Sequence, residues 1–272
     1  MSTSSASPFG EPTIRPARRL IEAFHDARYV LWDFDGPLVR LFAAPDESSG
    51  AYVPPLIADD FRAAMSKCGV ATGPFEGTRD PHAIYQSAGE WIREVDGESD
   101  ADELLCYMRQ RLDALEGKAA QTAEPTPGAA ELARELSEQG KCLAVTSNNS
   151  AEAVKTYLCR TDVAAGGLMR YFTGPIVGRA ADPSLMKPHP WCVEEAMRQL
   201  GGGSRPVAPT DCLMIGDSPA DALAAAEAKI AFCGYAGRPH KRDKLIASGV
   251  PEDMIVSHLD VCEASLKAHV RV

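Results

Sequence analysis

Two aspartates, Asp33 and Asp35, follow directly after a short apolar run at residues 29–32. The run is rich in strand formers and ends at a turn signal, which predicts a strand buried in a parallel sheet. Ligands of such sheets bind beyond the carboxyl ends of the strands. Residues two apart in an extended backbone project to the same side, so the two carboxylates are expected to lie close together. Carboxylates this close repel unless a cation balances them or one is protonated, so the pair needs a partner charge.

Two later apolar runs, at 142–145 and 212–215, also end in polar residues. The polar residues that follow are Thr146, Ser147 and Asn148 after the first run, and Asp217 and Asp221 after the second. Helical patterns separate the runs, and strands that alternate with helices predict a doubly wound, Rossmann-like parallel sheet of the α/β class. Because the carboxyl ends of parallel strands lie on one edge, the three polar clusters are expected to converge.

Residues 41–122 have a different character. Residues 41–57 have the Pro and Gly content of a linker, and helical patterns follow at 59–67, 81–95 and 102–115. No convincing strand occurs among them. The sequence therefore predicts an α/β core formed by residues 16–40 and 123–272, with an all-helical cap domain inserted at 41–122. Residues 1–15, rich in Ser and Pro, are predicted to be a disordered tail.

Composition limits the range of functions. Of 272 residues, 45% are hydrophobic and 24% charged, as in soluble globular proteins, and the formal net charge is −10. An acidic chain is a poor general binder of nucleic acid or of anionic membranes. The N-terminal segment lacks the apolar core of a signal peptide, and the eight cysteines have no zinc-site spacing, so a cytoplasmic protein with reduced, buried cysteines is expected.

Four motifs occur in a specific order: DxDG at 33–36, a hydroxyl residue after a strand at 146, Lys-Pro at 187–188 and GDxxxD at 216–221. This order resembles the haloacid dehalogenase superfamily. More narrowly, it is similar to the phosphoglycolate phosphatase and β-phosphoglucomutase branch, which has a helical cap between the first two motifs. The resemblance covers residues 28 to about 250. Each motif alone is weak, but four in this order are specific.

The resemblance implies a phosphatase that acts on a small phosphorylated metabolite. Asp33 would be the nucleophile and form an aspartyl-phosphate, and Asp35 would protonate the leaving oxygen and then activate water. Lys187 would offset negative charge on Asp33 and the phosphoryl group. Thr146, followed by Ser147 and Asn148, would bind the phosphoryl oxygens.

The resemblance also implies a Mg²⁺ cofactor. Asp33, the main-chain carbonyl of Asp35, and Asp217 would hold the ion, which suits a hard cation with oxygen ligands. Asp221 would hold a metal-bound water or orient Lys187. Each residue has a purely structural alternative: Asp221 could form a capping box with Ser218, for example. The oligomeric state is not determined by the sequence.

Other functions stay open. A phosphosugar mutase would use the same site and return the phosphoryl group to a sugar, and a non-catalytic binding protein could share the fold. Dehalogenases and phosphonatases are less well matched, because their first motif lacks the second aspartate that is present here as Asp35. Pro37 departs from the common DxDGT pattern, so any contact made by that threonine is in doubt.

Three further features have no assigned role. Asp80 and Pro81 favour a helix start, although His82 could instead reach the substrate from the cap. The basic cluster at 238–242 favours a solvated loop, with a site for a second acidic group of the substrate as the alternative. Arg179, in a Gly-rich connection, is undecided.

Overall fold

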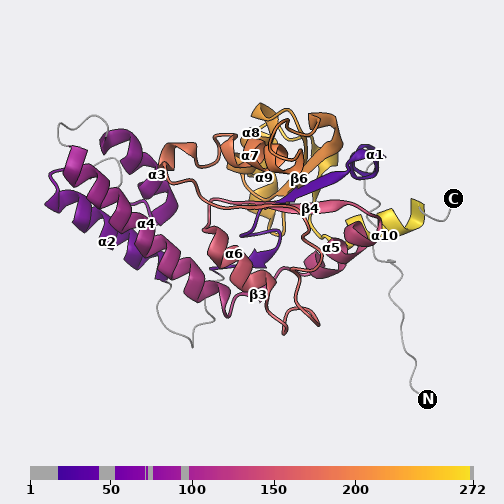
Figure 1. The fold of residues 1–272 in the computed structure, drawn as a ribbon, viewed down its shortest axis with the longest axis horizontal. Coiled ribbons are helices and arrows are strands. Elements are labelled where there is room, and N and C mark those ends of the chain that lie inside the picture. The colour runs from indigo at the N-terminus through magenta and orange to yellow at the C-terminus, as the bar shows by residue number, and fades with distance from the viewer. Residues whose placement is uncertain (1–17, 43–52, 71, 73–75, 93–97, 270–272) are drawn as a thin grey trace, which may run out of the picture.

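The computed structural model describes residues 18–42, 53–70, 72, 76–92 and 98–269. Its core is a six-stranded parallel sheet in the order β5-β4-β1-β6-β7-β8 (Figure 1). The strands are β1 (Tyr29–Trp32), β4 (Cys142–Thr146), β5 (Ile176–Val177), β6 (Cys212–Gly216), β7 (Ala231–Tyr235) and β8 (Ile255–Val256). The predicted α/β class and doubly wound parallel sheet are confirmed.

Strand β1 lies at the centre of the sheet, between β4 and β6. Its last residue, Trp32, is in register with Val145 of β4 and Ile215 of β6. One step further along each chain come Asp33, Thr146 and Gly216, so these three positions are level at the carboxyl edge. Sheet register thus brings together residues that are more than a hundred positions apart in sequence.

Helices cover both faces of the sheet because side chains alternate between its faces. Trp32 belongs to one apolar cluster and Leu31 to another, and both side chains are fully buried. The first cluster includes residues of α1 (Arg18–Asp26), α5 (Ala129–Glu138), α6 (Ala151–Leu158) and α10 (Asp260–His269), and the second includes residues of α7 (Trp191–Leu200) and α8 (Pro219–Glu227). Figure 1 shows α7 and α8 on one side of the sheet, opposite α5 and α6.

Three helices, called the cap helices below, form a separate group at one end of the molecule: α2 (Val53–Lys67), α3 (Pro81–Ile92) and α4 (Glu98–Ala120) (Figure 1). They pack around their own apolar cluster, which includes Phe61, Tyr85 and Met108. The chain enters and leaves this group through two short antiparallel strands, β2 (Val39–Arg40) and β3 (Glu124–Pro125). The exact domain boundaries, at 41 and 122, stay predictions.

Several element boundaries differ from those expected. Helix α2 begins at Val53 rather than near residue 59, so Pro54 and Pro55 lie in its first turn and not in a linker. Proline is tolerated there because first-turn N–H groups have no partner within the helix. Strand β5 was not predicted, since two residues carry no periodicity. The segment 1–15 and the expected end of the second cap helix, at Val95, lie outside the described residues.

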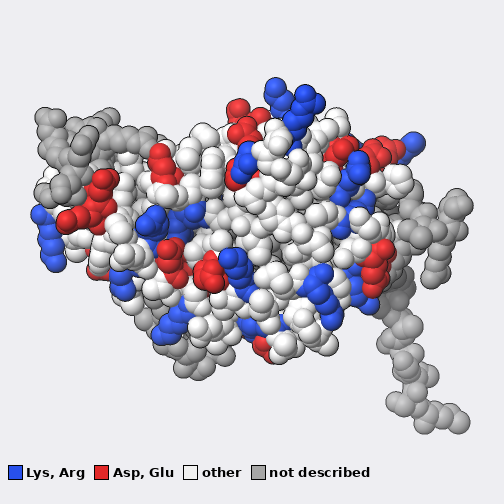
Figure 2. Space-filling view, in the orientation of Figure 1, with Lys and Arg blue, Asp and Glu red and all other residues white. Residues whose placement is uncertain are grey.

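The remaining elements are α9 (Pro239–Ala247) and the 3₁₀ turns η2 (Pro183–Leu185), η3 (Pro209–Asp211) and η4 (Glu252–Met254). On the face in Figure 2, basic and acidic side chains are interspersed, and neither sign forms a continuous area. Among the helices within the described ranges, none combines the length and apolar character needed to cross a bilayer. Of the eight cysteines, Cys68 and Cys159 are exposed and Cys106 and Cys142 are half-buried, so the expectation that all are buried is wrong for these four.

Candidate active site

Asp33 lies at the carboxyl end of the central strand. Its backbone N–H donates to the carbonyl of Ile215 at 2.8 Å, which extends the β1–β6 ladder by one residue and fixes the Cα. The residue is 7% exposed, and its Oδ1 lies 2.6 Å from Nζ of Lys187. Burial is the main cause that raises the pKa of Asp33, and the neighbouring carboxylate of Asp221 adds to it, while Lys187 lowers it in part.

Lys187 is the buried partner charge that the sequence required. Its ammonium group donates to Oδ1 of Asp33, to Oδ1 of Asp221 at 2.5 Å and to the carbonyl of Thr146 at 3.0 Å. Burial alone would lower the pKa of Lys187, but the carboxylates of Asp221 and Asp33 raise it overall. The ammonium therefore stays charged, and Lys187 is not a surface lysine, because the residue is only 3% exposed.

Asn148 positions Lys187 through the backbone. Its Oδ1 accepts from the Lys187 N–H at 2.8 Å, and its Nδ2 donates to the Lys187 carbonyl at 3.0 Å. The loop after β4 is thus tied to the Lys-Pro segment, whose Lys187–Pro188 peptide bond is cis. The side chain of Asn148 binds the protein backbone, and its place in the loop that binds phosphate stays a prediction.

Asp221 performs the two tasks that the sequence left open. Ser218 and Asp221 form a reciprocal capping box at the start of α8, in which Oδ2 of Asp221 accepts from the Ser218 N–H at 3.0 Å. Its other oxygen, Oδ1, accepts from Lys187. One carboxylate therefore caps a helix and orients the lysine. Of the two active-site roles considered for Asp221, holding a metal-bound water or orienting Lys187, the contacts match the second.

Asp35 and Gly36 form the turn that leaves the strand. Oδ1 of Asp35 accepts from the Leu41 N–H at 2.9 Å, and burial raises the pKa of Asp35 to about 6 despite that hydrogen bond. Gly36 has φ +123°, and a Cβ at this position would overlap the carboxylate of Asp217. The turn and the end of β6 are therefore in direct contact.

We expect Gly36→Ala to lower kcat by on the order of 100-fold or more, because the methyl group must displace Asp217. The left-handed backbone adds a stability cost of about 1–3 kcal/mol. Gly249→Ala is the matched control: its φ is +91°, but no atom lies within 4 Å of the added Cβ. The control should lose stability and keep its kcat. Steady-state kinetics and urea unfolding of both variants test this, and equal kcat in the two variants would contradict it.

The hydroxyl groups of Thr146 and Ser147 differ in whether they are free to bind a substrate oxygen. Thr146 is fully buried, and its Oγ1 has no hydrogen-bond partner among the described residues. The Ser147 hydroxyl is already engaged, since it donates to Oδ1 of Asn149 at 3.1 Å and accepts from the Asn149 N–H. A buried hydroxyl without a partner is costly, so Thr146 is the better candidate to bind a substrate oxygen.

The charges of the cluster leave room for a divalent cation. Two ammonium groups lie among four carboxylates. The ammonium groups belong to Lys187 and to Lys241, which contacts Oδ2 of Asp217. The carboxylates belong to Asp33, Asp35, Asp217 and Asp221. Two negative charges are therefore unbalanced. Burial chiefly raises the pKa of Asp217 to about 7, and the neighbouring carboxylate of Asp221 adds to it, while the ammonium of Lys241 lowers it in part.

Side-chain oxygens of Asp33, Asp217 and Asp221 lie within 4.8 Å of one another. Both oxygens of Asp221 are occupied by Lys187 and by the helix cap, so Asp33 and Asp217 are the better side-chain ligands. Buried carboxylate oxygens in this number suit Mg²⁺. The residues present therefore fit the predicted metal.

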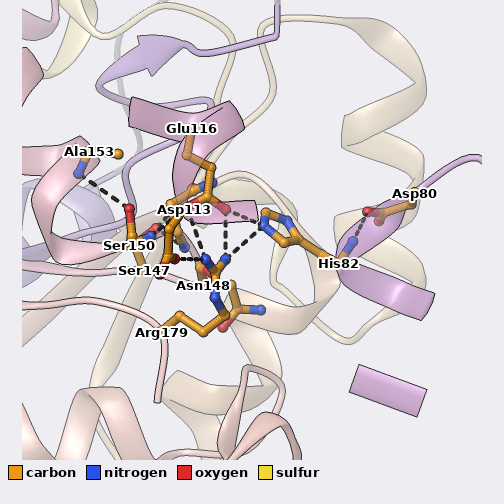
Figure 3. Close-up of polar contacts among 10 residues, drawn as sticks. Asp80, His82, Asp113, Glu116, Ser147, Asn148, Ser150, Ala153 and Arg179 are labelled. Atoms are coloured by element: carbon orange, nitrogen blue, oxygen red, sulfur yellow. Dashed lines mark hydrogen bonds and ion pairs between the residues drawn. The ribbon is translucent and has the colours of Figure 1, made fainter. Parts of the chain in front are cut away.

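A second buried ionic cluster ties the cap helices to the loop after β4 (Figure 3). Oε1 of Glu116, on α4, lies 2.6 Å from Nη1 of Arg179 and 2.6 Å from Nε2 of His82, which lies on α3. The same Arg179 nitrogen donates to the carbonyl of Asn148 at 2.9 Å, and its Nη2 contacts Asp113. Glu116 is fully buried and Arg179 nearly so, so this is an ion pair shielded from water.

Oε2 of Glu116 also accepts from the Ser150 N–H at 2.7 Å. Ser150 in turn caps α6 by accepting from the Ala153 N–H (Figure 3). One cap carboxylate thus holds the loop that carries Thr146 and Asn148. His82 is bound to Glu116, while Asp80 caps α3 by accepting from the His82 N–H at 2.9 Å.

Comparison with known proteins identifies the family. Residues 27–229 match the sequence model of the haloacid dehalogenase-like hydrolases. The chain belongs to this family. Among curated proteins, none matches it. The fold resembles that of a predicted phosphatase from Clostridium acetobutylicum, with 19% identity and a TM-score of 0.57 over 90% of this chain and 98% of that one. It also resembles a provisionally assigned phosphatase from Clostridium difficile, with 18% identity and a TM-score of 0.52 over 88% and 98%.

This haloacid dehalogenase-like hydrolase has a cavity of about 490 Å³ where the cap helices meet the core. Its walls include Asp35, Gly36 and Asp217 from the core, and Leu112 and Leu115 from α4. Asp33, Thr146 and Lys187 are not in the cavity wall and lie buried next to those core residues. A ligand in the cavity would therefore contact the outer part of the aspartate cluster.

The sequence did not single out Glu116 of the hydrolase. Leu104, Met108, Leu112 and Ala120 recur every four residues on α4 and are buried, and Glu116 completes this series. An acidic residue inside an apolar stripe needs a buried partner, so the four-residue spacing could have indicated that Glu116 is buried in an ion pair. The partner, Arg179, could be found only from the fold.

Proposed function

We propose that this hydrolase is a Mg²⁺-dependent phosphatase that cleaves a small phosphorylated metabolite through a phosphoryl intermediate on Asp33. The observation that carries the proposal is the buried contact of 2.6 Å between Asp33 and Lys187, with Lys187 held in turn by Asp221. A charged ammonium keeps the nucleophile oriented and offsets its repulsion from a phosphate. Family membership supports hydrolysis, and the cluster chemistry supports a phosphate monoester as the substrate class.

In the first step, a carboxylate oxygen of Asp33 attacks phosphorus, and the bond from phosphorus to the ester oxygen breaks. The departing alcohol oxygen takes a proton from Asp35. This role suits Asp35, since burial raises its pKa to about 6, so a fraction of the side chain holds a proton near neutral pH. The buried Thr146 hydroxyl donates to a phosphoryl oxygen.

In the second step, water attacks the phosphorus of the aspartyl-phosphate. Asp35, now ionised, accepts a proton from that water, and the bond from phosphorus to the Asp33 oxygen breaks. Inorganic phosphate leaves, and Asp35 is protonated again for the next cycle. Lys187 balances the Asp33 carboxylate as its charge returns.

Asp33, Asp217 and the main-chain carbonyl of Asp35 are the proposed ligands of Mg²⁺, which would supply positive charge beside the phosphoryl oxygens. We expect chelation with EDTA to lower the hydrolysis of phosphate monoesters by on the order of 1000-fold, with recovery on adding Mg²⁺. Mg²⁺ should also raise the melting temperature of the native protein and fail to do so in Asp217→Asn.

A panel of phosphorylated metabolites, with 4-nitrophenyl phosphate as a generic substrate, tests the activity. Full turnover in EDTA would contradict the metal requirement. Conversion of glucose 1-phosphate to glucose 6-phosphate without phosphate release would identify a mutase instead.

A further inference from the structure

Three arginines from separate segments line the cavity beside the aspartate cluster. Arg40 is the last residue of β2, Arg79 precedes α3 in the cap, and Arg238 is the residue before the first turn of α9. Burial raises the pKa of the hydroxyl of Tyr235, another wall residue, and the charge of Arg40 lowers it in part, so the Arg40 guanidinium lies near this hydroxyl. Convergence from three parts of the chain distinguishes this set from a charged helix surface.

The acidic groups of the wall are already engaged. Lys241 contacts Asp217, Asp35 accepts from a backbone N–H, and Asp80 caps α3. Across the ranges that the structure describes, none of the three arginines has a carboxylate oxygen within 4.0 Å. Guanidinium groups stay charged at any physiological pH, so the cavity wall has one more cationic group than carboxylates: the three arginines and Lys241 face Asp35, Asp80 and Asp217.

The reacting phosphoryl group does not account for that surplus. Its proposed partners, Asp33, Thr146 and Lys187, lie beneath the cavity rather than in its wall. A substrate whose phosphorus is at Asp33 would extend its alcohol portion past Asp35 into the cavity. The guanidinium groups would then face the part of the substrate that is not transferred.

We propose that the substrate carries a second anionic group, a carboxylate or a second phosphate, and that Arg40, Arg79 and Arg238 bind it. This rests on the proposed phosphatase function. Planar guanidinium groups match carboxylate and phosphate oxygens with two parallel hydrogen bonds, which gives selectivity as well as affinity. Phe42, Leu112 and Leu115 supply apolar wall area for a short carbon skeleton. The cavity, at about 490 Å³, suits a small metabolite.

Matched pairs of substrates test the proposal. Comparing 3-phosphoglycerate with glycerol 3-phosphate isolates a carboxylate, and comparing fructose 1,6-bisphosphate with fructose 6-phosphate isolates a second phosphate. We expect the dianionic member of at least one pair to have a kcat/KM on the order of 10–100-fold higher, equivalent to about 1.4–2.7 kcal/mol. The pair that shows the difference in kcat/KM identifies the second anionic group as a carboxylate or as a phosphate.

Variants then assign the preference to the cavity. Each of Arg40→Gln, Arg79→Gln and Arg238→Gln should reduce it, and the triple variant should abolish it. Hydrolysis of 4-nitrophenyl phosphate should stay within about two-fold of the parent, because that substrate has no second anion. Arg205→Gln, at an exposed arginine outside the cavity wall, is the control and should keep the preference.

Equal kcat/KM within both pairs, or an unchanged preference in the triple variant, would overturn the proposal. Calorimetric binding to Asp33→Asn separates it from the proposed function. Tighter binding of a dianionic ester than of its partner, without turnover of any ester by the parent protein, would keep the anion subsite and reject the phosphatase. Turnover of the esters without any preference for the dianionic member would keep the phosphatase and reject the anion subsite.

Discussion

Replacing Asp33 with asparagine is expected to lower kcat by on the order of 10⁴-fold or more, as loss of a covalent nucleophile does in other hydrolases. The amide has nearly the same shape, but it lacks the charged oxygen that would bond to phosphorus. Lys187 keeps Asp221 as its partner at 2.5 Å, so no buried charge is left alone. The melting temperature should therefore stay close to that of the parent protein.

The measurement is steady-state hydrolysis of 4-nitrophenyl phosphate with Mg²⁺, alongside thermal unfolding. Asp243→Asn is a suitable control, because this exposed aspartate on α9 lies outside the cluster. It should have the activity of the parent. Retention of more than about a tenth of the parent kcat in Asp33→Asn would exclude Asp33 as the nucleophile.

Replacing Glu116 with glutamine is expected to destabilise the protein by about 3–5 kcal/mol, the usual cost of removing one partner of a buried ion pair. The exposed side-chain fractions of Arg179 and Glu116 are 2% and 0%, so water cannot replace the lost charge. Among the residues that the structure describes, the variant leaves the buried guanidinium with only the half-exposed Asp113 as a counter-ion. Urea unfolding at neutral pH measures the difference.

The Glu116 carboxylate should also make the free energy of unfolding depend on pH. Burial raises the pKa of Glu116, but the hydrogen bond from His82 and the charge of Arg179 lower it to about 2 overall. Since the folded pKa lies below the ordinary value of 4.5, Glu116 contributes its full stability above pH 4.5 and loses it as the pH falls toward 2. The stability gap between parent and Glu116→Gln should accordingly narrow below pH 4.5.

Glu103→Gln controls for helix and surface effects, since Glu103 is an exposed residue of the same helix. It should change the unfolding free energy by less than about 0.5 kcal/mol. If Glu116→Gln were no less stable than this control at pH 7, the ionic cluster would not stabilise the junction between α4 and the loop after β4.

The strands that carry the chemistry could be predicted because their residues are continuous in sequence and buried on both faces. Residues 29–32, 142–145 and 212–215 have this pattern, and polar residues follow each run. Local capping was predictable for the same reason, as with Ser150 and the Ser218–Asp221 box. Strand β5 could not be predicted, because its two residues become a strand only by pairing with β4.

The sequence by itself determined the order of motifs, the fold class and the need for a charge opposite Asp33. Those properties depend on residue type and on short-range periodicity, which sequence contains directly. The family resemblance already placed Lys187 opposite Asp33; only the tertiary structure decided that Lys187 lies beneath the cavity, and that Lys241 pairs with Asp217 and Arg179 with Glu116. Such pairs join residues from 24 to 154 positions apart, and sheet register and helix packing set their distances.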